Sequence, residues 1–151
     1  MSQAAQVIEL LTSTNGAFIQ AEAISASGSS IVPGDLLAIN AAGEVLEHAT
    51  SDGISQKAIA LKNLATAGEI DDAYAVGETV SYGFAQPGQI AYMTLATSQV
   101  ATRITALVSN GDGTLKIATI SATTITGAVV GYPVEPVTTT GATARIKVRI
   151  A

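Results

Sequence analysis

Side chains that could carry out acid–base or nucleophilic chemistry are sparse in this sequence. Its 151 residues include one His, no Cys and no Trp, and 13% of them are charged. His48 is the one candidate general base, and Glu47 beside it would point to the opposite face of a strand. A hydrolase of the nucleophile-elbow type also needs Gly-x-Ser-x-Gly, which does not occur. We interpret His48 as an exposed strand residue and expect no catalytic site, so the chain is not predicted to be an enzyme.

Carboxylates gather at two places where a cation could bind. Glu69, Asp71 and Asp72 form the densest group, but they lack the glycine-punctuated spacing of a calcium loop. Residues 110–114 resemble the opening of such a loop, yet Ser121 stands where its last ligand, a Glu, would be. We interpret both groups as turns and predict neither a metal nor a cofactor.

Basic residues cluster once, at Arg145, Lys147 and Arg149. Their spacing of two places them on one face of a strand. Two interpretations stay open: the solvated side of an edge strand, which Lys and Arg protect against unwanted pairing, or a contact with an acidic partner. The net charge of −5 argues against nucleic acid as that partner, since such binding needs clustered cations.

Segments of high β propensity alternate with Gly, Asn, Asp and Pro throughout the chain. Hairpins are expected between residues 36–40 and 45–49, between 105–109 and 115–119, and between 78–84 and 90–95. The last surrounds Pro87-Gly88, which is typical of a type II turn. Residues 121–126 read as a loop without charges, and only residues 59–74 leave space for a helical turn. The predicted fold is all-β, a small barrel or β-tulip-like sandwich with little helix.

One module recurs along the sequence. Five residues of the stretch 36–62 have an identical residue 70 positions further along: Leu37, Asn40, Gly43, Ser51 and Ala58 match Leu107, Asn110, Gly113, Ser121 and Ala128. In both copies a strand runs into an Asn-x-x-Gly turn and a second strand. A duplication or the convergence of two similar hairpins would produce this pattern. Either suits a small barrel with pseudo-symmetric halves.

The N-terminal segment is expected to differ from the rest. Residues 26–30 read as a flexible joint, which divides an arm or hairpin (1–30) from a β-rich domain (31–151). The arm carries the apolar residues Val7, Ile8, Leu10, Leu11 and Phe18. Val7, Ile8, Leu10 and Leu11 could add a strand to the sheet of a neighbouring molecule, or belong to the domain's own first strand. No apolar run approaches the roughly 20 residues of a membrane-spanning helix, so no membrane partner is predicted.

The order of these features resembles the head decoration (cement) proteins of tailed bacteriophages over about residues 30–151. The resemblance rests on turn-and-strand patterns: Val32-Pro33-Gly34-Asp35-Leu36-Leu37, Gly43-Glu44-Val45, His48-Ala49-Thr50, Asp71-Asp72-Ala73-Tyr74, Val76-Gly77-Glu78-Thr79-Val80, Gly111-Asp112-Gly113-Thr114-Leu115 and Ala144-Arg145-Ile146-Lys147-Val148-Arg149-Ile150. Such proteins are β-rich and often trimeric, and they bind the outside of the expanded capsid. The family offers no catalytic residues to transfer.

The resemblance implies a virion structural protein that is made in the host cytoplasm and sits on the capsid exterior. Its partners would be the major capsid protein and further copies of itself, as a homotrimer. Candidate residues for capsid or subunit contact are Val7, Ile8, Leu10, Leu11, Phe18, Arg145, Lys147 and Arg149. Alternatives are another phage exterior module, such as a head fibre base or tail tube component, and a small hydrolase that uses His48.

Overall fold

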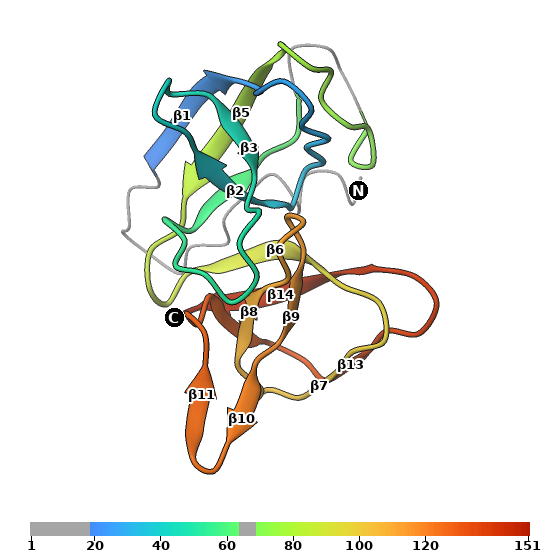
Figure 1. The fold of residues 1–151 in the computed structure, drawn as a ribbon. Coiled ribbons are helices and arrows are strands. Elements are labelled where there is room, and N and C mark those ends of the chain that lie inside the picture. Colours follow the sequence, from blue (N-terminus) through green and yellow to red (C-terminus); the bar gives the residue numbers. More distant parts are fainter. Residues whose placement is uncertain (1–18, 64–68) are drawn as a thin grey trace.

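The computed structural model describes residues 19–63 and 69–151, and these are all-β, without helix. The strands form two five-stranded units that follow one another along the chain and lie end to end in Figure 1. The first unit, barrel 1, contains β1 (Ile19–Ile24), β2 (Leu36–Ile39), β3 (Val45–Glu47), β4 (Ala58–Ala60) and β5 (Thr79–Phe84). The second, barrel 2, contains β6 (Ile90–Leu95), β8 (Leu107–Ser109), β9 (Leu115–Ile117), β12 (Gly131–Pro133) and β14 (Ala144–Ile150).

Four short strands lie outside these two units. β7 (Val100–Ala101) pairs with β13 (Val137–Thr138), and β10 (Thr119–Ser121) pairs with β11 (Thr124–Thr126). The β10–β11 hairpin projects from the lower end of barrel 2 in Figure 1, and all its strand residues are exposed. The sequence predicted a loop there. That prediction was wrong because the turn at Ala122 and Thr123 carries none of the usual Asn-Gly or Pro-Gly signals.

The two units have the same topology. Barrel 1 has the strand order β1-β5-β4-β2-β3, and barrel 2 has the matching order β6-β14-β12-β8-β9 and is closed. A parallel pair closes each of them, Ser25 with Val45 in barrel 1 and Leu95 with Leu115 in barrel 2. These pairs are 70 residues apart, the offset seen in the sequence.

Hydrogen bonds repeat at the same offset. The amide of Asn40 donates to the carbonyl of Glu44 over 2.9 Å, as that of Asn110 does to Thr114. The amides of His48 and Ala118 likewise donate to Leu36 and Ala106. Two β-hairpins that had merely converged would not share the closing strand pair and these flanking bonds, so the 70-residue pattern marks a repeated barrel.

One turn type introduces several of the strands. At residues 32–35, 75–78 and 86–89 the third residue is a Gly with φ between 79° and 97°. The side chain of the fourth residue accepts a bond from the amide of the first, as Asp35 does from Val32 at 2.8 Å. A positive φ at that position is what a type II turn requires and what Gly supplies without strain. The turn predicted at Pro87-Gly88 is therefore confirmed.

The hairpin predicted around Pro87-Gly88 was wrong, however. β5 pairs with β1 and β4, whereas β6 pairs with β14 and β9. The turn thus connects the last strand of barrel 1 to the first strand of barrel 2. The hairpins β2–β3 and β8–β9 are confirmed.

The N-terminal division predicted at residue 30 does not hold for the part that the structure describes. β1 pairs with β5 along its whole length, and Ser25, Ala26 and Ser29 are buried. Residues 19–30 therefore belong to barrel 1, because their backbone completes its sheet. Residues 1–18, with Val7, Ile8, Leu10, Leu11 and Phe18, lie outside the described residues, and the arm stays a prediction.

The hydrophobic cores of the two barrels are joined. Barrel 1 is filled by Ile31, Leu37, Val45, Tyr74, Val80 and other buried side chains. Leu36, Ile59 and Ala85 also belong to barrel 1, but they pack with the core of barrel 2, which includes Met93, Leu95, Leu107, Leu115 and Val148. Burial of these large apolar side chains at the junction makes the two barrels one packed body.

Candidate functional site

The basic residues of β14 share the outer face of barrel 2, as their spacing predicts. Ile146, Val148 and Ile150 alternate with them and are buried inside. The edge-strand interpretation was wrong, because β14 pairs with β12 on one side and β6 on the other. Because β14 lies between two other strands of a closed barrel, these cations do not protect an open edge.

Two of these cations lie over aromatic rings of the neighbouring strands. Lys147 Nζ is 5.7 Å from the centre of the Tyr92 ring, and the Arg149 guanidinium is 6.0 Å from that of Tyr132. Each pair is also a cross-strand pair, since Lys147 faces Tyr92 and Arg149 faces Tyr132 in register. Such contacts limit the rotamers of the long side chains and orient their charges on the surface. We call Lys147, Arg149, Tyr92 and Tyr132 the cation–tyrosine face.

Arg145 has a different role from the other two. Its guanidinium forms an ion pair with Asp71 at 2.7 Å and donates to the carbonyl of Ile70 at 3.1 Å. It thereby ties the turn at residues 69–72, which leads into β5, to β14 of barrel 2. The sequence grouped Arg145 with the contact residues, but the structure engages it within the chain.

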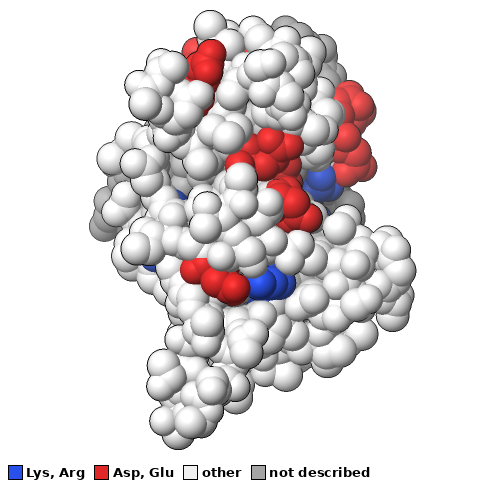
Figure 2. All heavy atoms as spheres, viewed as in Figure 1, with Lys and Arg blue, Asp and Glu red and all other residues white. Residues whose placement is uncertain are grey.

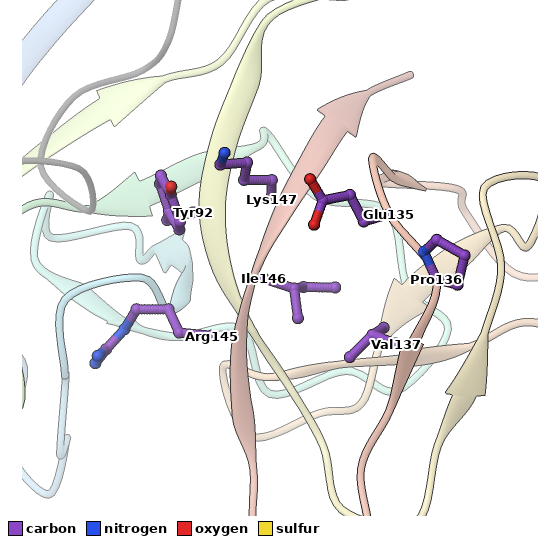
Figure 3. Close-up of a pocket in the computed structure, with 7 residues that line it drawn as sticks. All are labelled: Tyr92, Glu135, Pro136, Val137, Arg145, Ile146 and Lys147. Carbon is purple, nitrogen blue, oxygen red and sulfur yellow. The ribbon is translucent and has the colours of Figure 1, made fainter. Parts of the chain in front are cut away.

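A hollow of about 200 Å³ lies beside the cation–tyrosine face. In Figure 3, Ile146 and Val137 point into the space between β14 and the segment that carries Glu135, while Arg145 points away from it. The lining combines Lys147 with the exposed carboxylate of Glu135 and an apolar floor. This shape and mixture suit contact with a protein surface.

His48 is buried, with 4% of its surface exposed, so the prediction of an exposed residue was wrong. Its Nε2 lies 3.0 Å from the carbonyl of Ile54, which can only accept, so Nε2 carries a proton. In the neutral imidazole, Nδ1 then accepts from the Ser109 hydroxyl of barrel 2 over 2.7 Å. Ser109 is completely buried and no substrate could reach its Oγ. The pair joins the two barrels, and its buried geometry does not suit nucleophilic catalysis.

Three carboxylates also approach one another at the junction. Asp35 is buried beside Gly113, and Glu47 and Asp112 lie near enough to raise its pKa further. Burial is the main cause that raises the pKa of Asp35 to about 7. Figure 2 shows Asp and Glu side chains gathered along the middle of this face of the molecule.

Asp112 behaves differently, because its neighbours favour the charged form. Burial acts to raise its pKa, but hydrogen bonds from Thr114 and Asn110 outweigh this and lower it. The predicted turn chemistry at residues 110–114 is confirmed, since the amide of Thr114 donates to Asp112 Oδ1 over 3.0 Å. Asp72 accepts from the amide of Glu69 in the same way. Within residues 19–63 and 69–151, no group of three or more His, Cys, Asp or Glu is placed to hold a metal ion.

Sequence reasoning missed the projecting β10–β11 hairpin as a candidate contact element. Its strands read Thr-Ile-Ser and Thr-Ile-Thr, and Ile120 faces Ile125 across the pair. β-branched residues on both sides of a two-residue turn were a usable signal.

Known protein-family models and curated protein sequences do not match this chain. In the described part of the chain, no helix has the length and apolar character that crossing a membrane requires.

Proposed function

We propose that this chain is a virion structural protein of a tailed bacteriophage. It binds the outer surface of the mature capsid through the major capsid protein, as a homotrimer, and stabilises the shell against the pressure of packaged DNA. The cation–tyrosine face is the observation that carries the proposal.

Two cations that are already oriented on a rigid barrel suit repeated docking. Lys147 and Arg149 are held over Tyr92 and Tyr132 by strands that are paired on both sides. Less side-chain entropy is lost when such residues meet an acidic surface than when free side chains do. Weak contacts of this kind add up through the many copies on a capsid. The adjoining hollow would receive an apolar side chain of the partner.

Co-sedimentation with purified heads tests the proposal. We expect the protein to bind expanded heads that lack it and to raise their resistance to heat or chelators. Lys147→Glu and Arg149→Glu should each reduce occupancy at least several-fold, and added salt should weaken wild-type binding, since the contact is electrostatic. Lys62→Glu changes the charge equally at a site in barrel 1 and is the matched control.

Two results would contradict the proposal: no binding of the wild-type protein to expanded heads, or equal occupancy for both variants and the control. Deleting residues 1–16 is a separate test of the arm. If the arm adds a strand to a neighbour, occupancy falls; if it does not, occupancy is unchanged.

The β10–β11 hairpin favours a second candidate, another phage exterior module such as a tail tube component. Proteins of that kind build rings from projecting hairpins. Here the strands have only three residues each, so the hairpin would cover a small part of a ring wall. Decoration of the head therefore remains our first proposal.

A further inference from the structure

Residues 49–56 of barrel 1 and the β10–β11 hairpin of barrel 2 occupy equivalent places in the repeat. Asp52 and Ala122 are 70 positions apart, and both adopt a positive φ, 61° and 57°, that is unusual for residues other than Gly. The first segment lies against barrel 2, whereas the strands of the second are exposed throughout. The exposed β10–β11 hairpin is thus the equivalent, in barrel 2, of the segment by which barrel 1 contacts its neighbour.

The contacts between residues 49–56 and barrel 2 show how barrel 1 binds barrel 2. The amide of Asp52 donates to the carbonyl of Ser109 over 3.0 Å, and its own carbonyl accepts from Ala128 at the same distance. Its carboxylate pairs with Lys116 at 3.2 Å. A second contact between the barrels joins Gly34 and Thr94, whose amide donates to the carbonyl of Gly34 over 3.3 Å.

We propose that the β10–β11 hairpin of one molecule docks on barrel 1 of a second copy of this chain, as residues 49–56 dock on barrel 2. In each observed contact, the residue of barrel 1 is replaced by the one 70 positions later and the residue of barrel 2 by the one 70 positions earlier. These replacements predict the contacts between molecules. The pair Asp52–Lys116 becomes Ala122 against Leu46. The pair Gly34–Thr94 becomes Ile104 against Ile24.

Both transposed pairs are chemically matched. Ala122 and Leu46 are both apolar, whereas their equivalents Asp52 and Lys116 carry opposite charges. An apolar pair therefore replaces the ion pair in the predicted contact. Ile104 and Ile24 are 88% and 53% exposed, so the transposed contact would bring two accessible apolar side chains together. The docking surface continues the barrel–barrel interface already present in the chain.

The receiving surface has a groove that suits side chains of the hairpin. A groove of about 470 Å³ on barrel 1 is lined by residues including Leu37, Ala38, Ile39, Leu46 and Ile54, with no charged residue among its lining. The hairpin is uncharged as well, and Ile120 on it is 67% exposed. A two-stranded hairpin is marginally stable alone in water, so a partner surface would also order it.

This contact is heterologous, because hairpin and groove are different surfaces of the same molecule. Repetition of such a contact closes a ring or extends a filament. A ring of three copies would supply the homotrimer of the proposed function, and the inference rests on that proposal for the number of copies alone. The docking itself follows from the repeat.

Charge exchange at the predicted contact tests it on the isolated protein. We expect the wild-type chain to associate in sedimentation velocity at micromolar concentration. Leu46→Lys and Ala122→Asp should each weaken association at least tenfold. The combination of Leu46→Lys with Ala122→Asp should restore most of it and make it sensitive to salt, because it rebuilds the Asp52–Lys116 pair between molecules. Asp at position 122 suits the backbone, as Asp52 has the same φ.

Val76→Asp is the matched control, since it puts a charge on an exposed apolar residue of another turn and should leave association unchanged. Far-ultraviolet circular dichroism checks that each variant is folded. A monomeric wild-type protein overturns the inference, as does association that is insensitive to positions 46 and 122 or is lost only when residues 1–18 are deleted. A monomer that still binds heads overturns the inference and the homotrimer, and leaves the proposed binding to the capsid standing. An associating protein that ignores heads contradicts the capsid binding and leaves the inference standing.

Discussion

At the scale of single residues, the buried polar groups of the barrel junction are better explained by their effect on stability than by a catalytic role. Asp35 is buried against Gly113 and faces Glu47 and Asp112. Desolvation disfavours its charged form, so the folded chain holds a proton there that the unfolded chain has already released near neutral pH.

Asp35 should make the protein less stable as the pH rises. Its pKa is about 7 in the folded state against 3.8 as the ordinary value. A raised carboxyl pKa contributes stability that is complete below about pH 4 and is lost as the pH rises through 7. Asp35→Asn keeps an acceptor for the amide of Val32 and should raise the free energy of unfolding at pH 8 by on the order of 3 kcal/mol.

Urea unfolding at pH 4, 6 and 8 measures this effect. The variant should show a flatter dependence on pH than the wild-type protein, while Glu135→Gln, at an exposed carboxyl, should follow the wild type. Parallel pH profiles for Asp35→Asn and wild type would show that Asp35 ionises normally.

His48 and Ser109 should be coupled across the junction. Their 2.7 Å hydrogen bond is buried and links β8 of barrel 2 to the residue that follows β3 of barrel 1. Ser109→Ala should cost about 1 kcal/mol and His48→Ala about 2–4 kcal/mol, since the latter also leaves a cavity. A double-mutant cycle from urea unfolding should give a coupling of about 1 kcal/mol. Strictly additive losses would show that the His48–Ser109 hydrogen bond does not stabilise the junction.

At the scale of elements, the repeat supplies its own control for the junction. Gly43 and Gly113 end equivalent turns with φ of 82° and 80°. A Cβ at Gly43 would meet nothing within 4 Å, whereas one at Gly113 would lie 3.1 Å from the carboxyl carbon of Asp35. Both Ala substitutions therefore carry the same backbone strain, and only the second disturbs the contact between barrels.

We expect Gly43→Ala to lower the free energy of unfolding by about 1 kcal/mol, the usual strain of a side chain in the left-handed region. Gly113→Ala should lower it by roughly 1 kcal/mol more, because Asp35 must move or its turn must open. Chemical denaturation of the two variants side by side gives the difference. Equal losses would mean that the junction accommodates the methyl group freely.

Local turn chemistry accounts for how much of the fold the sequence could predict. The Asn-x-x-Gly hairpins and the Pro87-Gly88 turn follow from φ requirements of a few neighbouring residues, and they were predicted correctly. Strand partners depend on distant residues, so β5 and β6 were wrongly paired, and one of the two interpretations of β14 wrongly placed it at an edge. His48 follows β3, and its buried partner Ser109 belongs to barrel 2, a contact that no local sequence signal shows. The offset of 70 residues was the one non-local signal.

At the scale of the whole molecule, the chain behaves as one body made of two similar barrels. A covalent pair of barrels could unfold in two steps if each core were complete. Here Leu36, Ile59 and Ala85 leave barrel 1 to pack in the core of barrel 2, and Leu36 is completely buried. Exposing this junction would uncover apolar surface on both sides, so neither barrel should persist after the other opens.

Hydrogen exchange should therefore report the same free energy of opening for slowly exchanging amides of β5 in barrel 1 and β6 in barrel 2. Leu36→Ala should lower both values together by about 2–5 kcal/mol, since the cavity lies in the shared core. Val80→Ala is the matched comparison: Val80 is equally buried but packs within barrel 1. If the barrels are one cooperative unit, this substitution too should lower protection in barrel 2. Protection that persists in barrel 2 while barrel 1 exchanges freely would separate them into independent units, with the junction a contact between two domains.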